Sequence, residues 1–329
     1  MNFFNEESRS QVSRSMRVAL FFDHTVPHTT GHYVRRGLEQ FCEVHVYFPK
    51  EARQLKTGDY DLFLCVDDSS HQVYLSHLTP SVLWILDTHM TFLADTIMAR
   101  RFDFVFVNNK QATLRFRKHG IPKACWLPVA CDPDIHGSVK AGKIYDVAFI
   151  GSDGWGQRRR LIRRLRREFP VSFIGRAPHT SIGTIYSQAR VVFNCSISDD
   201  LNMRTFEALC SGSCLVSNLN VQGLTTLFIP NEHLLTYETD DEAMEAIKWC
   251  LQEEDKRERI ALSGRTEVLA KHTYWHRARV ICETIQKESC EYDRRRSRAL
   301  LGDAAIELVL KSLNQFYKID YCARQWFMS

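Results

Sequence analysis

Short apolar runs alternate with stretches of helical spacing along most of this chain. Runs of strand type occur at 17–22, 44–48, 60–66, 82–86 and 102–107, with helical spacing at 33–41 and 92–100. A strand that is apolar along its whole length is buried on both faces, so helices must cover both sides of its sheet. The alternation therefore predicts an α/β fold built on parallel sheets, in which ligands bind beyond the carboxyl ends of the strands.

The same alternation restarts after a polar stretch in the middle of the chain. Small and polar residues fill 136–143, and the apolar run 145–150 then begins a second set of strands and helices, in which 227–235 is expected to form another short strand. A length of 329 residues suits two domains. We expect a disordered tail over 1–15, a first domain over 16–137, a second domain over 143–285, and further helices over 286–329.

Composition excludes several classes of protein. A hydrophobic content of 44% and a charged content of 25% are those of a globular chain. No apolar run reaches the ~18 residues of a transmembrane helix, and the first residues lack the apolar core of a signal peptide. Eleven scattered cysteines suit reduced thiols, which predicts a cytoplasmic protein. The net charge of +4 permits an anionic partner without requiring nucleic acid, and peripheral membrane contact through 300–327 stays open.

The stretch 199–228 predicts a helix, a tight turn and a buried strand. Helical spacing runs from Met203 to Cys210, Gly212 suits a left-handed helix end, and 214–217 is a short apolar strand. Three residues of the helix-capping type precede the helix: Asp199, Asp200 and Asn202. This arrangement places backbone N–H groups at one exposed end of a helix, where anions bind.

Arg204 and Glu207 stand one turn apart on that predicted helix. A guanidinium beside free N–H groups suits phosphate oxygens, and a nearby carboxylate accepts hydrogen bonds from ribose hydroxyls. The pair therefore suits a nucleoside diphosphate. The alternative is an ordinary surface pair, worth roughly 0.2–0.5 kcal/mol.

A second candidate for phosphate binding is the glycine-bearing loop 151–156, where Gly151 and Ser152 follow a strand. The helix after it is rich in arginine, at Arg158, Arg159, Arg160, Arg163, Arg164, Arg166 and Arg167. One arginine near its start, such as Arg158, suits a diphosphate. The alternatives for the rest are a solvated face of an amphipathic helix or a surface for a polyanion.

Polar side chains also follow the strands of the first half: Asp23, His24, Asp67, Asp68, Asp87 and His89. Their repetition at strand ends predicts a site there. The alternative for each aspartate is that it caps the next helix.

Three motifs give the chain a resemblance to a known family. The pattern N-x-R-x-F-E-A-x-x-x-G occurs at 202–212, a W-L-P-x-A-x-D-P run at 126–133, and an H-T-Y-x-x-R run at 272–277. They resemble group 1 glycosyltransferases of GT-B fold, and most closely the spore-maturation CgeB-like branch. The resemblance implies two Rossmann-like domains facing a cleft, with a C-terminal helix crossing back to the first domain.

The resemblance also implies roles for particular residues. In the wider family two acids flank the helix start, and the second binds the ribose of the sugar donor; Glu207 matches the second and Asp199 the first. The loop of Arg176 lies near the nucleotide base in GT-B relatives, and 272–277 is expected to pack and hydrogen-bond between domains. The full set of expected contacts with the sugar donor is Gly151, Ser152, Arg158, Arg176, Asp199, Asn202, Arg204 and Glu207.

The expected function is glycosyl transfer from a nucleoside-diphosphate sugar, UDP-, GDP- or TDP-linked, to a hydroxyl acceptor. No metal is expected, because the acids of Asp132-Pro-Asp134 lie in the linker run with proline between them; fixed positive charge would stabilise the departing diphosphate. Candidates for a base are Asp87, His89, His24 and Asp23, although a retaining reaction needs none. The alternatives are a non-catalytic protein of the same fold and a polyanion-binding protein that uses 158–167.

Overall fold

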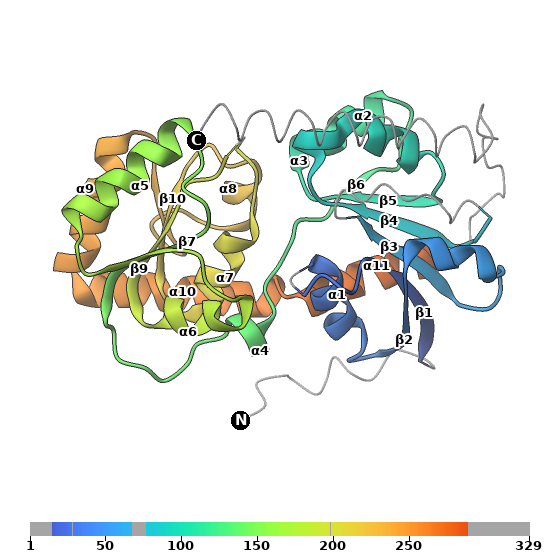
Figure 1. The fold of residues 1–329 in the computed structure, drawn as a ribbon, viewed down its shortest axis with the longest axis horizontal. Helices are drawn as coiled ribbons and strands as arrows, with labels where there is room; N and C mark the ends of the chain where they lie inside the picture. The colour runs from blue at the N-terminus through green and yellow to red at the C-terminus, as the bar shows by residue number, and fades with distance from the viewer. Residues whose placement is uncertain (1–14, 28, 68–76, 198, 289–329) are drawn as a thin grey trace.

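The computed structural model describes residues 15–27, 29–67, 77–197 and 199–288, which form two α/β domains (Figure 1). The first domain holds a six-stranded sheet in the order β2-β1-β3-β4-β5-β6, with every pair parallel. Its strands are β1 (Met16–Phe21), β2 (Cys42–Tyr47), β3 (Leu62–Asp67), β4 (Ser81–Ile85), β5 (Phe104–Val107) and β6 (Cys125–Trp126). Its helices are α1 (Thr30–Leu38), α2 (Thr88–Ala99) and α3 (Lys110–Lys118), with a 3-10 turn over Pro49–Gln54.

The second domain holds a five-stranded parallel sheet in the order β11-β10-β9-β7-β8. Its strands are β7 (Tyr145–Ile150), β8 (Ser172–Gly175), β9 (Ala189–Asn194), β10 (Cys214–Asn218) and β11 (Leu235–Tyr237). Its helices are α5 (Gly156–Glu168), α6 (Ile182–Ser187), α7 (Met203–Ser211), α8 (Leu224–Leu227), α9 (Asp240–Gln252) and α10 (Glu254–Lys271). The predicted parallel sheets are therefore confirmed.

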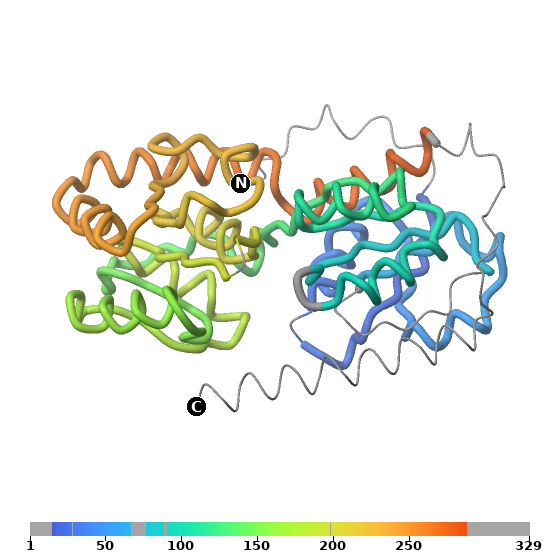
Figure 2. The backbone as a smooth tube through the Cα atoms, turned by 90° about the horizontal axis from the view of Figure 1, so that it is seen from above, coloured from blue at the N-terminus to red at the C-terminus, as the bar shows by residue number. Residues whose placement is uncertain are grey.

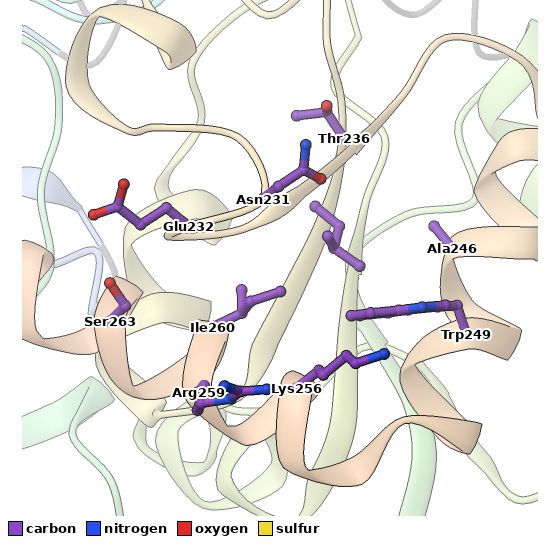
Figure 3. Close-up of a pocket in the computed structure, with 10 residues that line it drawn as sticks. Asn231, Glu232, Thr236, Ala246, Trp249, Lys256, Arg259, Ile260 and Ser263 are labelled. Atoms are coloured by element: carbon purple, nitrogen blue, oxygen red, sulfur yellow. The ribbon is translucent and has the colours of Figure 1, made fainter.

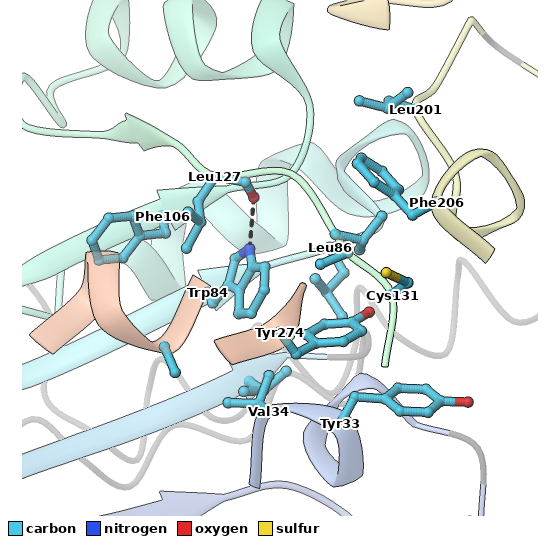
Figure 4. Close-up of a cluster of buried hydrophobic side chains, with 14 of the residues drawn as sticks. Tyr33, Val34, Trp84, Leu86, Phe106, Leu127, Cys131, Leu201, Phe206 and Tyr274 are labelled. Atoms are coloured by element: carbon cyan, nitrogen blue, oxygen red, sulfur yellow. Dashed lines mark hydrogen bonds between the residues drawn. The ribbon is translucent and has the colours of Figure 1, made fainter. Parts of the chain in front are cut away.

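Burial explains why the apolar runs became central strands. All five residues of β4 are buried, and Trp84 within it donates its indole N–H to the Leu127 carbonyl at 2.9 Å (Figure 4). Burying a large apolar side chain stabilises a fold by roughly 1.5–3 kcal/mol, so such strands are driven to the middle of a sheet. The core around Trp84 continues through Tyr274 to Phe206 of α7, so one apolar cluster spans both domains.

Two segments join the domains. The linker contains α4 (Pro133–His136), and α11 (Tyr274–Glu288) returns from the second domain to lie along α1 of the first, as Figures 1 and 2 show. The two helices touch closely: a Cβ at Gly37 of α1 would lie 2.6 Å from the Tyr274 carbonyl oxygen. The family resemblance implied a crossing helix, which we expected within 286–329; the helix that crosses is α11, which begins at Tyr274, in the part expected to belong to the second domain. The stretch from 289 onward, which was also expected to pack on the first domain, lies outside the described residues, as does the tail over 1–14.

The segment 272–277 forms the crossing itself. Thr273 forms an isolated parallel β-bridge with Cys131 of the linker, and the backbone N–H of Tyr274 donates to the Cys131 carbonyl at 3.0 Å. Buried Arg277 donates to the carbonyls of Pro128 and Val129 at 2.7 and 3.3 Å. The expected packing and interdomain hydrogen bonding of this motif are confirmed.

One predicted strand is wrong. The region from Leu227 to Leu235 was expected to form a strand, but the one-turn helix α8 and a loop occupy most of it. Gly223 adopts a left-handed φ of 89° that opens the helical turn, and Pro230 lacks the N–H that a strand needs. Within the described ranges, no helix combines the length and apolar character needed to cross a membrane.

Candidate functional site

The carboxyl ends of β7 and β9 form the point where the strand order of the second sheet reverses, and Arg204 lies there. Its Nε and Nη2 donate to the Ile150 carbonyl at 3.1 and 2.7 Å, and its Nη1 donates to Asn194 Oδ1 at 2.8 Å. Its guanidinium lies 4.4 Å from the centre of the Phe149 ring. Ligands of open parallel sheets bind at such a reversal point, so Arg204 occupies the position expected of a ligand-binding cation.

Gly151 makes room for that guanidinium. Its φ of 155° lies outside the range most residues adopt, and a Cβ there would stand 2.5 Å from Arg204 Nη2. The backbone N–H of Gly151 donates to the Gly175 carbonyl at 2.8 Å, which fixes the loop against β8. Ser152 follows in the same loop and is exposed, as is Arg176 just after β8.

Arg158, in the first turn of α5, reaches the same strand ends. Its Nε donates to the Cys195 carbonyl, directly after β9, at 2.7 Å. Burial, with the positive charge of Arg204 second, lowers the pKa of Arg158 to about 10. Two guanidinium groups thus lie close together at one edge of the sheet, an arrangement that favours a bound anion.

The other arginines of α5 mostly pair with carboxylates on the outside of the domain. Arg160 approaches Asp240 at 3.3 Å, and Arg164 and Arg166 meet Glu168 and Asp153 at 2.6 and 2.7 Å. The apolar stripe of Leu161, Ile162 and Leu165 is buried. These contacts favour the interpretation of α5 as an amphipathic helix with a solvated face.

The helix α7 forms as predicted, with Gly212 left-handed at its end, but the predicted caps are wrong. Asn202 precedes the helix without capping it, and its amide donates instead to Asn194 Oδ1 at 3.2 Å. Asp199 has a left-handed φ of 54° and accepts from the Asn220 amide. Among the described residues, α7 therefore begins without a side-chain cap, and the Thr205 N–H of its first turn donates to the Asn202 carbonyl at 3.2 Å.

Glu207 is buried, with 7% of its surface exposed, and its Oε1 lies 3.7 Å from Nε2 of His136 in the linker. The buried Tyr186 lies beside both Glu207 and Arg204: burial raises the pKa of its hydroxyl, Glu207 raises it further, and Arg204 opposes the rise. A surface ion pair between Arg204 and Glu207 is therefore the wrong interpretation. The two side chains flank Tyr186 and have different partners.

Two of the candidate bases, Asp23 and His24, follow β1 and have different surroundings. The Asp23 carboxylate accepts from the backbone N–H and hydroxyl of Thr25 at 3.0 and 2.5 Å, and these bonds hold the pKa of that carboxyl below its usual value. The His24 ring lies 3.9 Å from the Phe48 ring centre, and its Nδ1 has no partner among the described residues. His32 of α1, which the sequence reasoning missed, lies nearby with its ring 4.9 Å from that of Phe22.

The remaining candidates of the first domain lie at the ends of β3 and β4. Asp87 precedes α2 without capping it, and His89 falls in the first turn of that helix. Asp67 is the last residue of β3, and Asp68 lies outside the described residues. The structure therefore places Asp67 and Asp87 at carboxyl strand ends, as the sequence predicted.

Two hydrogen bonds that the sequence did not reveal hold the domains face to face. Asn109 donates to Asp200 Oδ1 at 3.1 Å, and Lys110 Nζ lies 2.9 Å from Thr226 Oγ1. In each bond the first-domain residue stands at the start of α3, just after β5. The carboxyl ends of both sheets thus approach one another.

A separate hollow of about 690 Å³ lies in the second domain, beside the first residues of β11 and between α9 and α10 (Figure 3). It is lined by Trp249, Lys256 and Arg259 together with the apolar side chains of Leu235 and Ile260. Its lining residues all lie between 231 and 263 and include none from β7 or β9, so the hollow is distinct from the site of Arg204.

Two parallel-sheet domains whose carboxyl strand ends face each other, with a helix crossing back to the first domain, define the GT-B fold. Solved structures of that fold confirm the assignment. HepE of Anabaena with UDP and glucose is 13% identical with a TM-score of 0.61, covering 83% of this chain and 100% of that one. Sucrose-phosphate synthase of Thermosynechococcus elongatus is 13% identical with a TM-score of 0.56, covering 84% and 100%.

A third solved structure is an α-glucosyltransferase with UDP and a DNA 13-mer; it is 11% identical with a TM-score of 0.61 and covers 85% of this chain and 100% of that one. A family model described as "Glycosyl transferase-like" matches residues 133–283, which include α4 and all the strands and helices around Arg204, from β7 to α7. No curated protein sequence matches the chain.

Proposed function

We propose that this protein is a glycosyltransferase that binds a nucleoside-diphosphate sugar in its second domain and transfers the sugar to a hydroxyl acceptor held by the first. The observation that carries the proposal is the placement of Arg204 and Arg158 together at the β7 and β9 ends, inside the segment that the glycosyl transferase-like family matches. Two adjacent cations at the reversal point of a sheet call for a ligand with at least two negative charges. A diphosphate meets that requirement.

The phosphate contacts come from side chains and backbone together. The bonds that Arg204 makes to described residues engage three of the five N–H groups of a guanidinium, which leaves others for phosphate oxygens. We expect the first turn of α7, which Asn202 does not cap, and the backbone N–H of Ser152 to supply further donors beside it; the N–H of Gly151 already donates to the Gly175 carbonyl. Arg176, exposed after β8, is proposed to lie near the base, and Asp199 and Asn202 complete the set at the start of α7.

Glu207 is proposed to bind the ribose. A carboxylate accepts hydrogen bonds from hydroxyls but repels phosphate, so it belongs on the nucleoside side of the diphosphate. HepE was solved with UDP and glucose, and the α-glucosyltransferase with UDP. A UDP-sugar is therefore the first sugar donor to test, ahead of GDP- and TDP-sugars.

The proposed chemistry uses fixed charge in place of a metal. As the bond to the anomeric carbon breaks, negative charge grows on the departing diphosphate, and preorganised guanidinium and N–H groups stabilise it. If the reaction inverts stereochemistry, His24 suits the base better than Asp23, because the Asp23 carboxylate is already held by Thr25. Asp87 and His89 stay candidates, and a retaining reaction would use the donor phosphate itself.

Two further properties belong to the proposal. The nine cysteines that the structure describes are all free, which supports a cytoplasmic location. The resemblance to the CgeB-like branch rests on the three sequence motifs. The alternative in which α5 binds a polyanion is weakened because Arg160, Arg164 and Arg166 already pair with carboxylates.

A thermal-shift panel with UDP, GDP, ADP, CDP and TDP tests the proposal. A ligand at about 100 times its dissociation constant stabilises the folded state by roughly 2.7 kcal/mol, a shift of several degrees. We expect one nucleoside diphosphate to raise the melting temperature of the wild type and to shift Arg204→Ala far less, each against its own baseline. The absence of a shift with all five would refute the proposed function.

A further inference from the structure

The one-turn helix α4 of the linker is held by both domains. Arg36 of α1 donates to the carboxylates of Asp132 and Asp134 at 2.6 and 2.7 Å. On the other side α4 packs on α6, where a Cβ at Gly183 would stand 2.4 Å from the Ile135 carbonyl oxygen. The position of α4 therefore depends on both domains at once.

His136, the last residue of α4, is fully buried, and its hydrogen bonding fixes its tautomer. The backbone N–H of Asp132 donates to Nδ1 at 3.0 Å, so Nδ1 carries a lone pair and the proton of the neutral ring is on Nε2. Burial lowers the pKa of His136; Glu207 opposes this effect and His179 adds to it. The imidazole is therefore neutral near pH 7 and presents one N–H group.

That N–H group points to Glu207. Nε2 has no hydrogen-bond partner among the described residues, and Glu207 Oε1 stands 3.7 Å away, just beyond hydrogen-bond distance. The rings of Tyr33 and Tyr274 are stacked 5.2 Å apart (Figure 4) and lie on the first-domain side of the imidazole. The Tyr33 ring is 5.3 Å from the imidazole ring of His136. A buried N–H without an acceptor is unfavourable, so a small movement that brings it to the carboxylate is favourable.

We infer that His136 is a positioning residue for Glu207: its Nε2–H hydrogen-bonds to the carboxylate when the nucleotide is bound and holds it toward the ribose hydroxyls. The inference rests on the proposed function. Because Arg36 holds α4 through Asp132, the same contact makes ribose binding depend on the first domain. In this inference neither His136 nor Arg36 touches the sugar donor, whereas Arg204 binds it directly.

The test measures how strongly the protein recognises the ribose. Calorimetric titrations compare UDP with analogues lacking the 2′- or the 3′-hydroxyl, and GDP with its matching analogues. Two variants separate the ring nitrogens: His136→Asn keeps an acceptor near Nδ1 and loses the Nε2 donor, whereas His136→Gln keeps a donor near Nε2. Both variants replace the ring by a smaller, uncharged amide side chain.

In the wild type we expect removal of the recognised hydroxyl to weaken binding about tenfold, as for one hydrogen bond to a charged group. We expect the ratio of the two dissociation constants, analogue over parent nucleotide, to fall toward one in His136→Asn and to be retained in His136→Gln. If the wild type binds neither UDP nor GDP, the proposed function itself fails. The positioning role alone is overturned if His136→Asn distinguishes the parent nucleotide from its deoxy analogue as strongly as the wild type does. It is also overturned if His136→Asn weakens the binding of all nucleotides by the same factor. A wild-type ratio near one also contradicts it.

Discussion

Replacing Gly151 by alanine should disturb the anion site without replacing a charged residue. The added Cβ would stand 2.5 Å from Arg204 Nη2, and that nitrogen is already held by the Ile150 carbonyl at 2.7 Å. Arg204 or the loop must therefore move. The unfavourable backbone conformation at φ 155° costs about 1–3 kcal/mol of stability. Loss of one charge-assisted hydrogen bond to phosphate costs about 1.5–3 kcal/mol of binding, or roughly 10- to 150-fold in affinity.

The assay is a calorimetric titration with the nucleoside diphosphate that stabilises the wild type most, together with urea unfolding. Gly175→Ala is the matched control, because Gly175 ends the neighbouring strand β8 and a Cβ there meets nothing within 4 Å. We expect the control to bind as the wild type does. If a folded Gly151→Ala protein also kept wild-type affinity, Arg204 would not hold the phosphates where we place them.

Three further outcomes are expected. Arg158→Gln should weaken nucleotide binding about tenfold, whereas Arg163→Gln on the outer part of α5 should not change it, as two parallel titrations would show. Burial, with the charge of Arg277 second, lowers the pKa of His272 from 6.5 to about 3. On acidification His272 of the unfolded chain is therefore protonated before His272 of the folded chain. The free energy of unfolding should fall by up to about 1.4 kcal/mol for each pH unit as the pH is lowered from 6.5 to 3. Urea midpoints across that window would show this slope, and a slope unchanged in His272→Phe would contradict the cause. Gly37→Ala should destabilise the protein by about 1–3 kcal/mol in urea unfolding, because its Cβ would meet the α11 backbone; a neutral effect would mean that α11 does not pack on α1 in solution.

The sequence was informative where burial decides the structure. Fully apolar runs such as 82–86 became central strands, and Gly212 ended its helix in the left-handed conformation as its position predicted. It failed where a short segment depends on its neighbours: 227–235 has apolar residues but takes its shape from Gly223 and Pro230. Periodicity does not reveal such local constraints.

The candidate site was predictable in its residues but not in its contacts. Spacing placed Arg204 and Glu207 one turn apart, yet it gave no indication that one reaches Ile150 and the other faces His136. Those partners come from segments far away in the chain, and only the packing of the sheet and linker brings them together. Asn202 shows the same limit, because its amide bonds to Asn194 in place of capping the helix.

The most direct test of the central claim is a crystal structure of the protein with the nucleoside diphosphate that gives the largest thermal shift. We expect the diphosphate within hydrogen-bond distance of Arg204 and the start of α7, with the ribose hydroxyls at Glu207. Electron density for the nucleotide elsewhere, for example in the hollow beside Trp249, would contradict the account.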